Sequence, residues 1–397
     1  MAYTETTRQS YGSKLSGSLK GIVFGFILLI GGTVLLWWNE GNSVKNAKAI
    51  KEAQSVSVNL ESIDAINPEM NGKMVHATGV ATTLDTLSDD LFGVKANAFK
   101  ISRTVEYYQW VEHSESKSKE KIGGATETVT TYTYKKEWVG QPISSSSFHD
   151  PDYQQSNRVL TTIEEKDIYA DNASFGAYVL PPYIISSISG SEPAAASLTP
   201  EMIKDWKTTL QDSLATVQAS GNTVYFGRNS GVPNIGDVRI TLTQVTAPKT
   251  ISILSKVVNN TFEPFIAKNG KTISKVAMGT VSAENMYEQA HKENKLWTWV
   301  LRIVGIIIVV AGLKSIFSIL SMLFAVLPFL KNLVGAATGL VCTILGLVWS
   351  LVVIAIAWIV YRPVLAISLL VVAAALIVFL VIKPGKKKTD TPVVEAK

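Results

Sequence analysis

The chain has 397 residues, of which 47% are hydrophobic, and its formal net charge is +5. The charge is modest and no dense basic stripe with interleaved aromatic residues is present, which argues against a nucleic-acid-binding protein. The single cysteine, Cys342, excludes an intrachain disulfide, so any folded domain must be stable without cross-links. The apolar residues concentrate at 21–38 and again from about 296 to 382, which indicates membrane segments.

The first apolar segment, 21–38, carries no charge and is long enough to cross the hydrocarbon of a bilayer. It is longer than the short apolar core of a signal peptide and ends in Trp37 and Trp38, which prefer the membrane interface. An uncleaved transmembrane helix is therefore favoured over a signal peptide. Residues 1–20, which carry several basic side chains, are predicted to be a cytoplasmic tail.

Residues 39–297 are ordinary in polarity and predict a large extracytoplasmic or lumenal α+β domain. Within it, 95–111 and 127–139 alternate between apolar and polar residues, which is typical of strands. Between them, 113–125 is rich in Ser, Lys and Glu, so we predict a two-stranded hairpin with a solvated tip. One face of its first strand carries Phe99, Ile101, Arg103, Val105 and Tyr107.

Further elements of this domain follow from the same patterns. A helix is predicted at 200–220, because Thr199 is a good N-cap, Pro200 suits the first helical position and Gly221 ends the apolar periodicity. Residues 144–157 and 186–198 are predicted loops. Additional strands are predicted at 73–82, 222–228, 237–245, 250–258 and 272–281.

The domain is predicted to continue into the membrane without a break. Ser282 can cap a helix, and no helix breaker separates it from the second apolar segment, 298–316. One continuous helix is therefore expected from the domain into the second span, so that movement of the domain would tilt that span.

The C-terminal apolar region predicts three spans, at 298–316, 335–359 and 364–382. Tyr361-Arg362-Pro363 would form a tight turn, since proline cannot continue a helix. Residues 317–334 are short and carry serines at helical spacing. An interfacial amphipathic helix followed by a loop is preferred there, and a long tilted extension of the second span is the alternative.

Orientation follows from the basic residues near these spans. With one N-terminal and three C-terminal transmembrane helices, residues 1–20, the 314–331 loop and the basic tail 383–397 lie on one side of the membrane, the cytoplasm. Both termini are therefore predicted to be cytoplasmic.

Residues that could perform chemistry are scattered. His76, His113, His149 and His291 form no His-Glu-x-x-His motif, and no Cys-x-x-Cys, phosphate loop or Gly-x-Ser-x-Gly is present. His149 with Asp150 and Asp152 could ligate a metal, but a solvated turn is the better interpretation. We therefore predict no catalytic, cofactor-binding or metal-binding residues, and no cofactor.

Four charged residues in apolar or strand contexts have two interpretations each. Glu106 and Glu112 share a strand face, as paired catalytic carboxylates would, but exposed sheet charge is favoured. Arg302 and Lys314 within apolar surroundings suggest transport. Both lie near predicted span ends, where snorkelling to the headgroups explains them.

Several short motifs recur in order along nearly the whole chain and together resemble a known family, the LUMA or transmembrane protein 43 family. They are Asn39-Glu40-Gly41, Lys73-Met74-Val75-His76 leading to Gly79, Phe92-Gly93-Val94, Tyr107-Tyr108-Gln109-Trp110-Val111-Glu112, Tyr132-x-Tyr134 with Glu137-Trp138, Gly236-Asp237-Val238-Arg239 and Tyr361-Arg362-Pro363. The resemblance implies four spans and a large lumenal or periplasmic domain, and it brings no catalytic residues.

The resemblance also implies a role in organising membrane protein complexes, which in animals takes place in the endoplasmic reticulum and inner nuclear membrane. In a bacterium the inner membrane would be the location. We expect a non-enzymatic, self-associating membrane scaffold whose partners are the lipid bilayer, further copies of the chain and other membrane proteins, but not nucleic acid. The alternative is a protein that binds or modifies lipid at the junction of domain and membrane.

Overall fold

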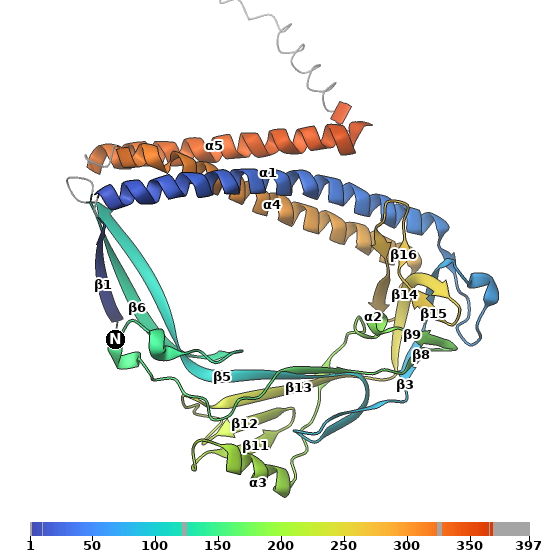
Figure 1. Cartoon of the computed structure of the whole chain (residues 1–397). Coiled ribbons are helices and arrows are strands. Elements are labelled where there is room, and N and C mark those ends of the chain that lie inside the picture. The colour runs from blue at the N-terminus through green and yellow to red at the C-terminus, as the bar shows by residue number, and fades with distance from the viewer. Residues whose placement is uncertain (1, 10, 121–124, 324–327, 365, 368–397) are drawn as a thin grey trace, which may run out of the picture. The chain divides into compact units, whose positions relative to one another are not determined.

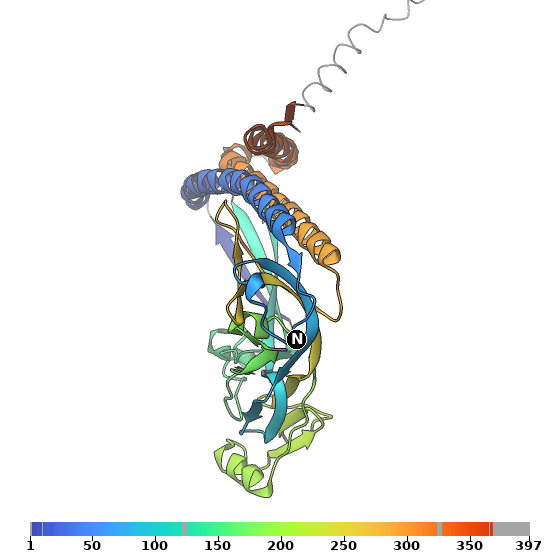
Figure 2. The same cartoon turned by 90° about the vertical axis from the view of Figure 1, so that its right-hand side faces the viewer.

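The structure is a computed structural model of the chain, shown in Figure 1 and, turned by 90°, in Figure 2. It describes every residue except 1, 10, 121–124, 324–327, 365 and 368–397. The chain divides into two compact units. The first, strand-rich unit comprises Met1–Ser16, Asn46–Asn294 and Phe324–Lys331. The second, helical unit comprises Gly17–Lys45, Lys295–Leu323 and Asn332–Lys397.

The larger sheet of the strand-rich unit is antiparallel and has nine strands among the described residues. They are β1 (Ala2–Gln9), β4 (Thr86–Asp89), β5 (Val94–Glu120), β6 (Thr126–Val139), β7 (Lys166–Tyr169), β10 (Glu192–Pro193), β11 (Thr216–Ser220), β12 (Thr223–Gly227) and β13 (Val238–Thr246). The main order is β1-β6-β5-β13-β12-β11; β4 and β7 pair with β5, and β10 pairs with β13.

The second sheet is mixed, because it contains both parallel and antiparallel strand pairs. Its seven described members are β2 (Val58–Asn59), β3 (Met74–Thr83), β8 (Ala173–Phe175), β9 (Tyr178–Leu180), β14 (Lys249–Val258), β15 (Thr261–Glu263) and β18 (Lys275–Met278). A small ribbon pairs β16 (Phe265–Ile266) with β17 (Thr272–Ile273). These strands confirm those predicted at 73–82, 250–258 and 272–281.

Both sheets contribute to one hydrophobic core. The predicted inward face of β5 is confirmed, because Phe99, Ile101, Val105 and Tyr107 are all buried. Arg103 shares that face and is buried as well; its guanidinium donates to both carboxylate oxygens of Asp89 at 2.8 and 2.9 Å. Both bonds come from Nη1, and Nε donates to the carbonyl oxygen of Glu164 at 2.9 Å. An opposite charge together with further hydrogen bonds is the condition under which such a charge is tolerated inside a fold.

The predicted hairpin is present, but it is longer than its apolar alternation indicates. β5 and β6 pair from Tyr107↔Val139 to Glu120↔Thr126, so most of the predicted tip is strand. Cross-strand hydroxyl pairs explain the extension: Ser116 Oγ lies 2.9 Å from Thr130 Oγ1, and Ser118 and Thr128 repeat that contact. Such pairs stabilise a ribbon that has no apolar face.

The helix predicted at 200–220 ends early. α3 covers Pro200–Thr209, with Thr199 Oγ1 accepting the amide of Met202 at 3.3 Å as the cap predicts. The chain then turns and re-enters the sheet as β11, in which Val217 is buried. Pairing with β12 overrides the local helical periodicity, since β-branched Thr216 and Val217 also suit a strand.

The N-terminal segment contains a strand that the sequence does not predict. Residues 2–9 form β1, which pairs along its length with β6, from Ala2↔Thr133 to Gln9↔Thr126. The register joins β1 to β6, whereas the sequence-based topology places residues 1–20 and 39–297 on opposite sides of a membrane. That topology stays a prediction.

Three long helices dominate the second unit: α1 (Tyr11–Val56), α4 (Ala283–Leu323) and α5 (Pro328–Tyr361). Each contains a candidate membrane span, at Lys20–Val56, Ala283–Ser318 and Gly339–Tyr361. Among the described residues these three are the only candidates, so the predicted count of four is not supported. Most of the fourth predicted span, 364–382, lies outside the described residues.

Glycines let α1 and α4 pack closely in antiparallel directions. A Cβ on Gly25 would lie 2.8 Å from the carbonyl oxygen of Gly312, and one on Gly305 would lie 2.6 Å from Leu36 Cδ2. Small residues at such crossings let the backbones of membrane helices approach. α5 runs beside them, with Trp349 Nε1 donating to Thr33 Oγ1 at 2.9 Å.

The predicted continuity of the second span is confirmed. The amide of Asn285 donates to Ser282 Oγ at 3.3 Å, and α4 then continues to Leu323 without interruption. Residues 317–323 therefore continue α4 and do not form a helix of their own, whereas the candidate span within α4 is Ala283–Ser318. Residues 324–327 lie outside the described residues, and 328–334 belong to α5.

Candidate functional site

The helical unit contains a buried polar centre where α1, α4 and α5 meet. On α1 it begins with Asn39-Glu40-Gly41, directly after Trp37 and Trp38. The side chain of Glu40 is fully buried. Asn39 Nδ2 donates to the carbonyl oxygen of Thr298 at 2.9 Å, which fixes the level of α1 against α4.

Arg302 on α4 neutralises Glu40. Its Nε donates to Glu40 Oε1 at 2.6 Å and its Nη2 to Oε2 at 2.9 Å. The guanidinium also lies 4.8 Å from the ring centroid of Trp299 and 5.6 Å from that of Trp358. A bidentate, stacked arginine is hard to replace with lysine, since the planar fork makes both kinds of contact.

α5 closes the centre from the third side. Trp358 Nε1 donates to Glu40 Oε2 at 2.8 Å, so this carboxylate accepts from two helices. The ring of Tyr361 packs on Gly41, where an added Cβ would lie 2.7 Å from it. Arg362 Nη2 reaches Ser43 Oγ at 3.3 Å. The motifs Asn39-Glu40-Gly41 and Tyr361-Arg362-Pro363, far apart in sequence, therefore meet in space.

Tryptophans mark the membrane level of this centre. Trp38, Trp297 and Trp299 are each more than half exposed and flank Asn39, Thr298 and Arg302 in sequence. Because tryptophan side chains collect at the headgroup level, the centre lies near one interface and not at the middle of the hydrocarbon.

The sequence-based interpretation of Arg302 as a snorkelling side chain is wrong. The side chain is 9% exposed and is held by Glu40. Lys314, interpreted in the same way, is exposed. One signal could have found the pair. Glu40 follows tryptophans at the end of the first apolar segment, and Arg302, of opposite charge, follows tryptophans at the start of the second, which puts them at similar depth in antiparallel helices.

The four histidines lie on different elements. His76 Nε2 lies 2.8 Å from the carbonyl oxygen of Val281, and His113 Nε2 lies 3.0 Å from Glu137 Oε1. His149 stacks on Tyr132 with ring centroids 3.9 Å apart. In the described part of the chain, no group of three or more His, Cys, Asp or Glu side chains could hold a metal ion.

Glu112 is not the exposed sheet charge that its strand position predicts. It accepts from the Tyr134 hydroxyl at 2.6 Å and from the His149 amide at 2.7 Å. Burial raises the pKa of Glu112, but these hydrogen bonds outweigh it and the pKa is lowered overall. Burial and the same carboxylate raise the pKa of Tyr134 to about 12. Glu106 is likewise bonded, to Arg239 Nε at 2.8 Å.

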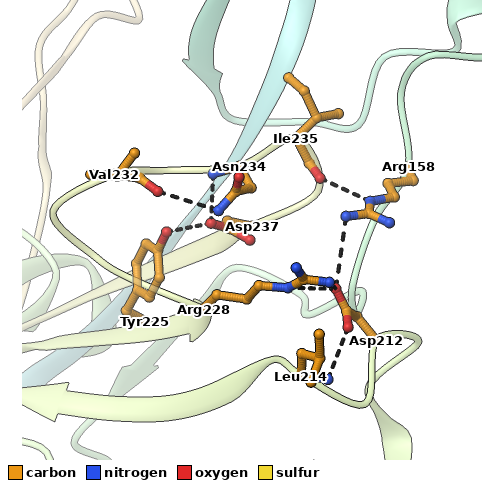
Figure 3. A network of polar contacts seen from close by, with 9 residues as sticks. All are labelled: Arg158, Asp212, Leu214, Tyr225, Arg228, Val232, Asn234, Ile235 and Asp237. Atoms are coloured by element: carbon orange, nitrogen blue, oxygen red, sulfur yellow. Dashed lines mark hydrogen bonds and ion pairs between the residues drawn. The ribbon is translucent and has the colours of Figure 1, made fainter.

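A second polar network fixes the loop between β12 and β13 in the strand-rich unit (Figure 3). Asp212 accepts from the amide of Leu214 at 2.9 Å and from Arg228 Nη2 at 2.8 Å, and these contacts lower its pKa. The Tyr225 hydroxyl donates to Asp237, whose carboxylate also accepts the Asn234 amide at 2.8 Å. The network joins strands to a loop: Asp212 pairs with Arg228, and Asp237 accepts hydrogen bonds from a hydroxyl and an amide.

A family model described as transmembrane protein 43 matches residues 107–363, which include Arg302, Trp358 and most of the strand-rich unit. The chain belongs to the transmembrane protein 43 family. The human transmembrane protein 43 is 26% identical over 94% of this chain and 93% of its own length. The rat protein is 26% identical, covering 91% of this chain and 90% of its own.

The Drosophila melanogaster homolog of transmembrane protein 43 is also 26% identical, over 89% of this chain and 92% of its own length. No solved structure matches the chain. The similarity to these relatives extends over most of the chain, and the family resemblance given by the motifs is confirmed.

Proposed function

We propose that this transmembrane protein 43 relative is a non-enzymatic membrane scaffold, which self-associates and holds other membrane proteins beside it. The observation that supports it is the polar centre around Glu40. Both carboxylate oxygens of Glu40 accept hydrogen bonds from the Arg302 guanidinium, and Trp358 Nε1 donates a third. Because these side chains hydrogen-bond to one another, they hold the three helices together. A reaction centre would instead need a group directed at a substrate.

The outer faces of the fastened helices supply the contact surface. Phe24, Ile27 and Val34 on α1 and Leu340 and Leu351 on α5 are all more than half exposed. In a bilayer such a face contacts either lipid chains or another apolar helix. Contact with a helix is favoured where the two surfaces pack closely. A rigid three-helix unit presents these faces in a fixed arrangement, which favours assembly.

Native mass spectrometry of the full-length protein in a mild detergent tests the proposal. We expect a defined oligomer, and we expect Arg302→Gln to shift it to monomer because the helices lose their fastening. Lys292→Gln, an exposed change on α4, is the matched control and should leave the oligomer intact. A wild-type monomer at every protein concentration would contradict self-association, and a monomer carrying stoichiometric lipid would favour the lipid-binding alternative.

A further inference from the structure

A cavity of about 610 Å³ lies on the strand-rich unit, over the face of the larger sheet that points away from the core. Trp138 of β6, Tyr225 of β12 and Arg239 of β13 line it, and the loop after β12 closes one side. The alternate residues Val224 and Phe226 point into the core instead. The volume lies within the range of small-molecule sites in proteins.

Aromatic rings form one wall. The Trp138 ring lies 5.2 Å from that of Tyr108 and 6.3 Å from that of Tyr225, measured between centroids. The Arg239 guanidinium lies 4.3 Å from the Trp138 centroid, and Glu106 holds it at 2.8 Å. The indole is thus fixed from several sides, which reduces the conformational entropy that a ligand would have to remove.

The loop after β12, part of which is drawn in Figure 3, also borders the cavity, through Ser230, Gly231 and Pro233. The Tyr225 hydroxyl donates to Asp237 and to the carbonyl oxygen of Asn229, the latter at 3.1 Å. The amide of Gly231 donates to Asn229 Oδ1 at 2.9 Å. The cavity is therefore formed before any ligand arrives.

The charged groups at this cavity are paired with opposite charges. Its cation, Arg239, is matched by Glu106, and nearby Arg228 is matched by Asp212. Besides Trp138 and Tyr225, the hydrogen-bonding side chains of the lining are one amide and three hydroxyls, those of Gln218, Ser220, Thr223 and Ser230. A phosphate or carboxylate ligand would need an unmatched cation, so the lining favours an uncharged ligand with many hydroxyls.

We propose that this cavity binds a neutral saccharide. A sugar ring has an apolar C–H face that can lie on an indole ring, here that of Trp138, and hydroxyls around its edge that suit amide and hydroxyl partners. The proposed scaffold role does not require this site, so saccharide binding would add to that role. The saccharide could be a glycan on a partner protein or a free oligosaccharide. Either source presents the same chemistry to Trp138 and Gln218.

Isothermal titration of the full-length protein tests this, with maltotriose and chitotriose as probes. The detergent must carry a polyoxyethylene headgroup, because sugar detergents would occupy the site. We expect at least one probe to bind with a Kd below about 1 mM. Trp138→Ala should weaken binding at least about tenfold, and Gln218→Ala, an exposed change that spares the fold, should weaken it about threefold or more.

Trp110→Ala is the matched control, since Trp110 lies on the same hairpin and does not line the cavity. It should leave the Kd unchanged. Failure of both probes to bind the wild type would overturn the proposal. Equal weakening by Trp110→Ala and Trp138→Ala would do the same, because it would trace the loss to the hairpin as a whole. Neither result depends on the oligomeric state.

Discussion

Glu40 and Arg302 are each buried because the other is present. Arg302→Gln leaves a buried carboxylate without its cation, so we expect the free energy of unfolding to fall by about 3–5 kcal/mol. Replacing both, as Glu40→Gln with Arg302→Met, removes the stranded charge and should recover much of that loss. Thermal unfolding in detergent measures both effects. Lys314→Gln at an exposed position is the control, and an unfolding curve for Arg302→Gln like that of the wild type would refute the pairing.

Glu112 supports a pH-dependent contact between the hairpin and the 148–150 turn. Its pKa is lowered in the folded state, so the contact stabilises the protein above the unfolded pKa, about 4.3, and is lost as pH falls through the lower folded pKa. Glu112→Gln should therefore lower the free energy of unfolding by about 1–3 kcal/mol at pH 7 and by less at pH 3. Urea unfolding at both pH values, with Glu137→Gln as control, checks it; an equal loss at both would be inconsistent with the lowered pKa.

Among the elements, the end of α3 shows most clearly that pairing in a sheet can override a helical periodicity in the sequence. A helix over 200–220 would bury Leu214 and Val217 on one face, yet Leu214 is 64% exposed and Val217 is 6% exposed. We therefore expect Val217→Asp to destabilise by at least about 2 kcal/mol, because it buries an unpaired charge. Leu214→Asp should change stability by less than about 0.5 kcal/mol. Comparable losses of stability for the two variants in urea unfolding would instead support a helix over the whole of 200–220.

Elements whose signal is local could be predicted from the sequence: the uncharged segment at 21–38, the alternation along β5 and the Ser282 cap of α4. What failed depended on contacts between distant segments. β11 exists because β12 pairs with it, and the burial of Arg302 requires Glu40, which lies on another helix. The hairpin extends beyond its predicted end because hydroxyls face each other across strands, which periodicity in one strand cannot reveal.

For the whole molecule, the position of β1 decides between two arrangements of the chain. α1 contains a candidate span that follows β1 directly and precedes all other strands. A spanning α1 separates β1 from β6, whereas the antiparallel register from Ala2↔Thr133 to Gln9↔Thr126 joins them. The two arrangements differ in which residues can meet, so a covalent link between β1 and β6 distinguishes them.

Thr7 and Thr128 are partners in this register. Directly paired strand residues have Cα atoms about 4.5–5.5 Å apart, within the range that a disulfide spans. In a Cys342→Ser background, Thr7→Cys with Thr128→Cys should therefore form an intrachain disulfide on mild oxidation, seen as a reducible gel shift at the monomer position. Thr7→Cys with Thr131→Cys, three residues out of register, should not. Labelling of the two cysteines from opposite sides of intact membranes, without a cross-link, would instead establish a spanning α1 with a cytoplasmic N-terminus. A cross-link found only in dimers would mean that β1 pairs with β6 of a second copy.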